Sequence, residues 1–257
     1  MKHINSKETS EKIIDFMKRV FKKAKFSQAV IALSGGIDSS VSCTLAVRAL
    51  GKENVFPVLL PYGELNSQGV TDAFKIIDML RIPKKNITQV NIQDFVDNII
   101  KTDYKMDLIR KGNIMARTRM IILFDQAKKR KALVIGTENK TEHLLGYFTR
   151  FGDEASDIEP LFNLYKTQIY ELANFLNIPK SILTKKPTAG LWENQTDEEE
   201  FGFTYREADE ILYLYFDKKL SSSNIIKKGF EKDTVAKVLQ FAKKNEFKHN
   251  LPFASEL

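Results

Sequence analysis

Apolar runs alternate with stretches of helical periodicity along most of the chain. The runs at 29–33, 55–60 and 132–135 are predicted to be buried strands. Over 41–50 and 70–80, apolar residues recur every three or four positions, which predicts helices. Strands that alternate with helices in this way favour βαβ units. The pattern therefore predicts an α/β fold with a doubly wound, open parallel sheet and helices on both of its faces.

Weaker patterns complete this picture. An amphipathic helix is expected over 13–24, before the first strand, and a short third strand over 87–92. Residues 95–125 are predicted to be mostly helical, with an interruption near Gly112. Further helices are expected to start at Tyr165-Lys166-Thr167, to follow the capping box Thr204-x-x-Glu207, and to cover 235–242.

One long segment, from Glu193 to Gly202, is acidic and has no apolar periodicity. It predicts either a mobile lid over a reactive site or a disordered surface loop. Because it offers no apolar face, we expect little to hold it in place without a ligand.

Composition limits the class of protein. A chain of 257 residues with 43% hydrophobic content can form one large α/β domain, so we expect a single domain over 1–257. Cys43 is the only cysteine, which excludes a disulfide framework and a cysteine-rich zinc site. The sequence contains no apolar run of transmembrane length and no signal peptide at its start. We therefore expect a cytoplasmic enzyme without a membrane partner.

The net charge of +7, from 40 basic and 33 acidic residues, could suit nucleic acid or a small polyanion. The lysine pairs, however, are spread along the chain, as is typical of solvated helix faces. The sequence shows no arginine-rich tract and no separate RNA-binding appendage. We expect no nucleic-acid partner.

The turn after the first predicted strand, Ser34-Gly35-Gly36-Ile37-Asp38-Ser39, carries the clearest candidate chemistry. Its glycines let backbone N–H groups approach a ligand closely, and the following helix adds its N-terminal partial charge. The turn matches neither common glycine-rich nucleotide fingerprint. Asp38 would repel a phosphate unless a cation lay between them, as Mg²⁺ commonly does. The sequence thus indicates a site for phosphates and a metal ion.

Two further polar residues, Thr137 and Glu142, follow the predicted strand at 132–135. In an open α/β sheet, ligands bind at the carboxyl ends of the strands near the switch point, so both side chains are expected close to Asp38. The two carboxylates predict a shared metal. Arg117 and Arg119 do not share a helix face. One of them can therefore point at a ligand while the other pairs elsewhere.

The Ser34–Ser39 turn resembles the pyrophosphate loop of the ATP pyrophosphatases, which cleave ATP between its α and β phosphates. Across nearly its whole length, the chain resembles the ammonia-dependent NAD⁺ synthetases of that superfamily. The resemblance is carried by Ser34 to Ser39, Gly112 to Met120, Gly136 to Glu142, Gly146 to Asp157, Tyr165 to Thr167, Lys186 to Leu191 and the lysine-bearing tail. It implies an adenine nucleotide alpha-hydrolase-like fold.

The resemblance also implies a reaction, that of a C–N ligase in NAD biosynthesis. The carboxylate of deamido-NAD⁺ attacks the α-phosphate of ATP, giving an acyl-adenylate and pyrophosphate, and ammonia then displaces AMP. Adenylation supplies the leaving group, and the enzyme must stabilise charge on the departing pyrophosphate. ATP is implied as co-substrate, Mg²⁺ as cofactor, and a homodimer with substrate near its interface. The apolar helix expected over 114–127 is compatible with such an interface.

The family's site residues carry over onto matching positions of this sequence. The resemblance implies ATP contacts at Ala32, Leu33, Ser34, Gly35, Gly36, Ile37, Asp38, Ser39, Thr137, Lys166 and Thr188. It implies deamido-NAD⁺ contacts at Arg117, Arg150, Asp157 and Lys248, and Mg²⁺ ligands at Asp38 and Glu142. Asp38 and Lys166 are the residues expected to be catalytic.

The chain departs from the family pattern in three places. Arg150 stands where the family usually has lysine, which keeps the charge but changes the geometry. The stretch 152–157 lacks the paired glycines often found there, and His249 is displaced by one from the family's usual His-Lys pair. No nucleophile or general base stands out. His143 is interpreted as structural, and either Asp153 or bulk water can accept the proton of ammonia.

Alternatives remain open at this point. A tRNA-modifying ATP pyrophosphatase fits the loop and the charge, although Cys43 has no partner for sulfur relay. A non-enzymatic basic nucleotide-binding module leaves Asp38, Glu142 and Arg117 unexplained together. For the synthetase, free ammonia is the expected nitrogen source. The sole cysteine is predicted inside a helix, and too few residues precede the first strand for a glutaminase domain.

Overall fold

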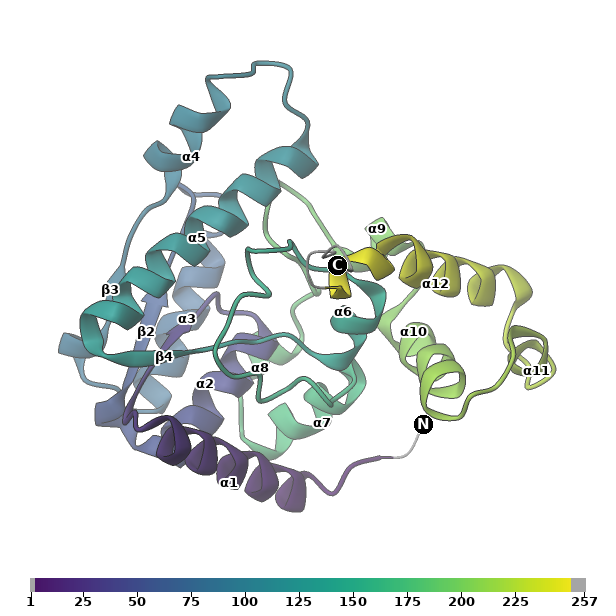
Figure 1. Ribbon diagram of the computed structural model, residues 1–257, viewed down its shortest axis with the longest axis horizontal. Helices are drawn as coiled ribbons and strands as arrows, with labels where there is room; N and C mark the ends of the chain where they lie inside the picture. Colours follow the sequence, from purple (N-terminus) through teal and green to yellow (C-terminus); the bar gives the residue numbers. More distant parts are fainter. Residues whose placement is uncertain (1–2, 251–257) are drawn as a thin grey trace, which may run out of the picture.

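A four-stranded parallel sheet lies at the centre of residues 3–250, the part of the chain that the computed structural model describes (Figure 1). The strands have the spatial order β3-β2-β1-β4. Their bounds are Gln28–Ala32 for β1, Val55–Leu59 for β2, Thr88–Gln89 for β3 and Ala132–Ile135 for β4. The chain winds from β1 outward to β3 and then returns to add β4 on the other side of β1. The predicted doubly wound α/β sheet is confirmed, and its switch point lies between β1 and β4.

Helices cover both faces of the sheet because successive strand residues point to opposite sides. Ala29 and Ile31 of β1 are buried in the core under one helical layer, and Val30 is buried in the core under the other. The first layer consists of α1 (Ser6–Ala24), α2 (Ile37–Leu50), α3 (Ser67–Met79), α7 (Lys166–Phe175) and α8 (Lys180–Leu183). The second consists of α4 (Gln93–Ile100) and α5 (Leu108–Arg130), which are blue and teal in Figure 1.

A third hydrophobic cluster lies beside the sheet, where the C-terminal helices pack around α6 (Figure 1). Aromatic side chains dominate its centre, including Tyr165, Phe201, Phe203 and Tyr205. The elements are α6 (Lys140–Leu145), α9 (Asp197–Phe201), α10 (Tyr205–Leu212), a π-helical turn at Tyr213–Asp217, α11 (Ser222–Ile226) and α12 (Lys232–Asn245). This cluster contacts the end of α6 through Leu145 and the start of α7 through Tyr165.

The interruption predicted near Gly112 is wrong. Helix α5 runs through this glycine without a break, and the gap lies earlier, between Ile100 and Leu108, where the Asp107 side chain caps the first turn of α5. Gly112 lies at a close packing contact instead, because an added Cβ would be 2.8 Å from Leu191 Cδ1. A glycine inside a helical pattern can thus mark a close approach rather than a helix end.

The expectation that little holds the 193–202 segment in place is also wrong. The segment contains α9, and its Gln195, Asp197 and Phe201 side chains are buried. Phe201 joins the aromatic cluster, while the two polar side chains are held by hydrogen bonds. Periodicity does not detect this kind of anchoring, since only one apolar residue takes part.

Within residues 3–250, every helix is too short or too polar to cross a lipid bilayer.

Candidate active site

The carboxyl ends of β1 and β4 bring the predicted site residues to one cavity of about 500 Å³. The Ser34–Gly36 turn and the start of α2 follow β1, whereas Thr137 and the start of α6 follow β4. Residues that follow β1 and residues that follow β4 both line the cavity. This is the place where open parallel sheets bind their ligands.

The turn after β1 is held in a conformation that only glycine adopts easily. Gly35 has φ +76°, and an added Cβ would lie 2.1 Å from the carbonyl oxygen of Gly69. The hydroxyl groups of Ser39 and Ser40 donate to the Gly36 carbonyl at 3.1 and 2.7 Å. Because α2 starts without a side-chain cap, its first N–H groups remain available to an anion.

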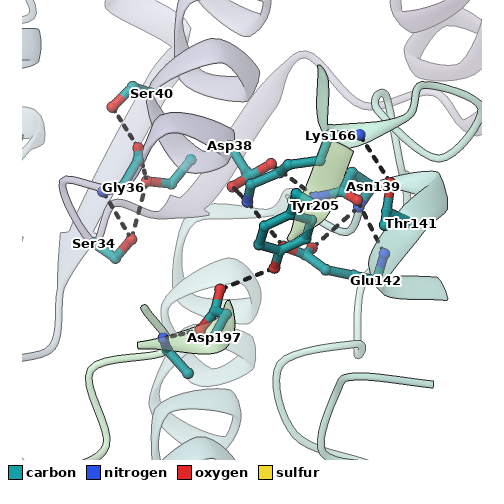
Figure 2. A network of polar contacts seen from close by, with 12 residues as sticks. Ser34, Gly36, Asp38, Ser40, Asn139, Thr141, Glu142, Lys166, Asp197 and Tyr205 are labelled. Atoms are coloured by element: carbon teal, nitrogen blue, oxygen red, sulfur yellow. Dashed lines mark hydrogen bonds and ion pairs between the residues drawn. The ribbon is translucent and has the colours of Figure 1, made fainter. Parts of the chain in front are cut away.

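Lys166 lies between the two carboxylates that were predicted to share a metal (Figure 2). Its Nζ donates to Asp38 Oδ2 at 2.6 Å and to Glu142 Oε1 at 3.1 Å. Asn139, the N-cap of α6, donates to the other Asp38 oxygen at 2.9 Å. The Lys166 side chain is 3% exposed, so this is a buried three-residue charge cluster at the foot of the cavity.

Burial and charge act against each other within this cluster. Burial opposes the charged form of Lys166, but Asp38 and Glu142 outweigh it and raise the pKa of the lysine. Burial acts to raise the pKa of Glu142, whereas the Lys166 ammonium 3.1 Å away acts to lower it and favours the ionised carboxylate. Lys166 is therefore a firmly charged cation that faces the phosphate loop.

A fully buried carboxylate, Asp209, fixes the backbone that carries Lys166. It accepts hydrogen bonds from the N–H and the hydroxyl of Thr167, both at 2.7 Å, and from the Thr141 hydroxyl. The same Thr141 oxygen accepts from the Lys166 N–H at 2.8 Å. Tyr205, one turn before Asp209 on α10, places its ring 4.9 Å from Lys166 Nζ. Neither residue could be singled out from the sequence, where both are ordinary positions of a capped helix.

Asp197 lines the cavity and links three segments of its wall through hydrogen bonds. Its carboxylate accepts from the Tyr205 hydroxyl at 2.9 Å and from the Ala189 N–H at 3.0 Å, and the Tyr147 hydroxyl lies 3.2 Å away. These bonds hold the segment that contains Thr188 against α9 and α10. The Thr188 hydroxyl itself accepts from the Gly190 N–H at 3.0 Å.

Most residues with an expected ATP or metal role line the cavity, and most of those expected to contact deamido-NAD⁺ do not. The lining includes Ala32, Leu33, Ser34, Gly36, Ile37, Asp38, Ser39, Thr137, Glu142, Lys166, Thr188 and Lys248. Gly35 is not part of the lining, although its neighbours Ser34 and Gly36 are. Arg117, Arg150 and Asp157 lie outside the lining.

The three residues outside the cavity have other contacts. The exposed Arg117 donates through Nε to the Arg150 carbonyl at 3.3 Å, and Arg150 donates to the Asn250 carbonyl at 2.7 Å. Asp157 accepts from the Val134 N–H at 2.8 Å, so it extends the edge of β4. Arg117 and Arg150 are therefore neighbours on one outer surface beside the cavity.

The tail residues cap the end of α6. Lys248 Nζ donates to the carbonyls of Gly146 and Phe148 at 2.7 and 2.8 Å, and His249 Nε2 lies 2.6 Å from the His143 carbonyl. His143 packs its ring 4.3 Å from Phe162 and does not line the cavity, in keeping with a structural role. Lys248 still contributes to the cavity wall.

A family model described as NAD synthase matches residues 9–252 of this chain. The chain belongs to the NAD synthase family. The NH(3)-dependent NAD(+) synthetase of Fusobacterium nucleatum is 42% identical over 254 residues, which cover 99% of this chain and 97% of the relative. The predicted family is therefore confirmed, and the chain is an ATP-using enzyme of NAD biosynthesis.

Solved structures agree with this family. An NMN synthetase from Francisella tularensis matches with a TM-score of 0.86 and 35% identity, covering 99% of this chain and all of the other. An NH3-dependent NAD synthetase from Campylobacter jejuni matches with a TM-score of 0.83 and 32% identity, covering 98% of this chain and 100% of the other. These likenesses favour the synthetase over the tRNA-modifying ATP pyrophosphatase.

Proposed function

We propose that this protein amidates deamido-NAD⁺ to NAD⁺ with free ammonia, and that Asp38, Glu142 and Lys166 form its reactive centre. The observation that carries the assignment of these residues is the buried contact of Lys166 with Asp38 and Glu142, 2.6 and 3.1 Å long, directly beside the phosphate loop. An acceptor carboxylate attacks the α-phosphate of ATP and pyrophosphate leaves. Ammonia then attacks the acyl carbon, loses a proton, and AMP leaves.

The residues of the cavity account for what this reaction requires. The turn at 34–36 and the start of α2 offer N–H groups to the phosphates of ATP. Lys166 places a fixed positive charge where negative charge accumulates on the α-phosphate and on the departing pyrophosphate. Because Asp209 and Tyr205 hold Lys166 in place, little reorganisation is needed during the reaction.

Asp38 and Glu142 fit the proposed Mg²⁺ ion. Both carboxylates converge on the same point, the Lys166 ammonium, and carboxylate oxygens are the donors that Mg²⁺ prefers. Residues 3–250 contain no group of three or more metal-binding side chains, so phosphate oxygens and water would complete the coordination. The bound ion would neutralise phosphate charge and orient ATP.

The proposed dinucleotide site uses the outer surface and a second copy of the chain. Arg117 and Arg150 meet there, and exposed apolar side chains lie nearby on α5, with Ile109 68% and Ile121 63% exposed. Ile109 also lines the cavity, so the cavity opens onto this apolar surface. A homodimer formed through α4 and α5 would cover these residues and bring the two proposed binding regions together.

The function is tested by measuring pyrophosphate release and NAD⁺ formation with ATP, Mg²⁺ and ammonium chloride. Deamido-NAD⁺, nicotinate mononucleotide and bulk tRNA are offered as separate acceptors. The second is included because the Francisella tularensis relative is an NMN synthetase. We expect turnover with deamido-NAD⁺ to exceed turnover with either other acceptor. Preferred use of nicotinate mononucleotide or tRNA would replace the proposed substrate.

Ammonia, rather than glutamine, is expected to be the nitrogen donor. Releasing ammonia from glutamine ordinarily needs an activated cysteine thiolate. Cys43 has no exposed surface, and burial raises the pKa of its thiol to about 12. The purified protein should form NAD⁺ with ammonium chloride and at least about 100-fold less efficiently with glutamine freed of ammonia. Comparable rates with both donors would contradict this prediction, and Cys43→Ser serves as the control for any glutaminase activity.

Arg117→Ala is expected to weaken deamido-NAD⁺ binding selectively. A lost charge-assisted contact should raise KM for deamido-NAD⁺ by roughly 10-fold or more and leave KM for ATP nearly unchanged. The matched control is Arg206→Ala, since Arg206 is exposed on α10. Steady-state kinetics with each substrate varied in turn provide the measurement. Equal changes in both constants, or loss of folding, would identify Arg117 as a structural residue.

A further inference from the structure

Arg119 is a cationic side chain in the cavity wall that has no role in the site described so far. It lies on α5, two residues after Arg117, and the two side chains point in different directions. Arg117 is exposed outside the cavity, whereas Arg119 lines the cavity and its Nε donates to the Leu60 carbonyl at 3.1 Å. Of these two arginines, the structure therefore directs the second toward the place where substrate must bind.

The charge of Arg119 is not neutralised by a contact within residues 3–250. None of the ion pairs in this part of the chain includes Arg119, and its one hydrogen bond is that to Leu60. Burial lowers the pKa of Arg119 to about 10, with the field of Asp153 acting in the opposite direction, so the side chain is charged near pH 7. Arg119 is half-buried, and a charge withdrawn in part from water is stabilised when an anion binds to it directly.

Lys166 and Arg119, two of the five basic residues that line the cavity, differ in how their charges are paired. Lys166 is paired with two carboxylates, at 2.6 and 3.1 Å. Arg119 has no such match. The carbonyl that accepts from Arg119 belongs to Leu60, which follows β2. Strand β2 pairs with β1, and β1 leads into the phosphate loop. The bond at Nε holds the guanidinium in place, and within residues 3–250 its two terminal nitrogens make no further hydrogen bond.

We propose that Arg119 binds an anionic group of a bound substrate, a carboxylate or a phosphate, through the terminal nitrogens of its guanidinium. The planar fork matches both groups. This inference rests on the proposed function, which supplies two anionic substrates to the same cavity. The anion replaces the water that solvates the free side chain and provides the counter-charge that the protein lacks at this position.

The test measures the affinity of the intact protein for three separate ligands by calorimetry: ATP with Mg²⁺, deamido-NAD⁺ and NAD⁺. NAD⁺ differs from deamido-NAD⁺ in carrying an amide instead of the nicotinate carboxylate. Arg119→Gln should lower at least one affinity by about 10- to 100-fold, the loss typical of a charged hydrogen-bonded contact. The control is Arg48→Gln, which removes the same charge from an exposed position of α2 and should leave all three affinities unchanged.

The pattern of losses identifies the anion. Weaker ATP binding alone assigns a phosphate of ATP. Weaker deamido-NAD⁺ binding with unchanged NAD⁺ binding assigns the carboxylate, and equal weakening of both dinucleotides assigns their phosphates. If all three affinities stay within about threefold of the wild-type values, the inference is wrong.

Folding is checked by circular dichroism. If Arg119→Gln does not fold, Arg119→Lys is measured in its place, because it keeps the charge and most of the aliphatic stem but loses the fork. Unchanged affinity of that variant for all three ligands also overturns the inference. These binding measurements do not depend on turnover. A wild-type protein that forms no NAD⁺ would therefore refute the proposed function without deciding the role of Arg119.

Discussion

Asp38→Asn is expected to lower kcat by about 100-fold or more while the protein stays folded. Asparagine keeps the size of the side chain but removes the charge that faces Lys166 at 2.6 Å and the proposed Mg²⁺. Both the orientation of ATP and the charge balance around Lys166 then change. Glu142→Gln tests the second proposed ligand, and we expect it to cause a loss of similar order. The measurement is initial rate at saturating ATP, Mg²⁺, ammonium and deamido-NAD⁺.

The control for this experiment is Asp78→Asn, which makes the same chemical change at an exposed position of α3. It should retain the wild-type rate. Near-normal turnover of Asp38→Asn at saturating Mg²⁺ would mean that Asp38 serves only to pair with Lys166. In that case the metal assignment of both carboxylates would fail.

The fold could be predicted from the sequence because its signals are local. The buried strands are continuous apolar runs, and the helices between them show clear periodicity. Periodicity does not explain why a particular residue stands at a particular position. Gly112 looked like a helix break, yet it allows Leu191 to approach α5 closely. The distinction depends on a contact between residues far apart in the chain.

The proposed reactive centre was predictable only in part, for the same reason. Strand order placed Asp38 and Glu142 at adjacent strand ends, and the resemblance added Lys166. Neither indicated that the Lys166 ammonium would lie between the carboxylates, a contact that spans 128 positions in the case of Asp38. Asp209 was missed altogether, although it is fully buried and holds the backbone at Thr167. A buried carboxylate on an amphipathic helix looks like any other polar position until its partners are known.

Arg117 and Arg119 illustrate what spacing alone leaves undecided. Two residues two apart on a helix must face different directions, and this much was predicted. Which of them faces the cavity depends on how α5 is rotated against β1 and β2. The rotation is set by apolar residues such as Met115 and Leu123, which are buried against the sheet. The family resemblance pointed to Arg117, which the structure places outside the cavity.

Lys166→Met is expected to have two large effects with different causes. Removing the only cation from the cluster leaves Asp38 and Glu142 facing one another in a buried site. The cost of breaking a buried ion pair from one side is about 3 kcal/mol or more. Urea unfolding should show this loss of stability. Turnover should also fall by about 100-fold or more, because Lys166 no longer offsets the charge that develops on the phosphates.

A double variant separates these two effects. In Lys166→Met with Glu142→Gln, one of the two unpaired carboxylates becomes neutral, so part of the lost stability should return. Turnover should not return, since neither the cation nor the proposed metal ligand has been restored. If Lys166 serves stability alone, the double variant should be no less active than Glu142→Gln by itself. That result would remove Lys166 from the catalytic centre and leave it as the residue that permits two carboxylates to share a buried position.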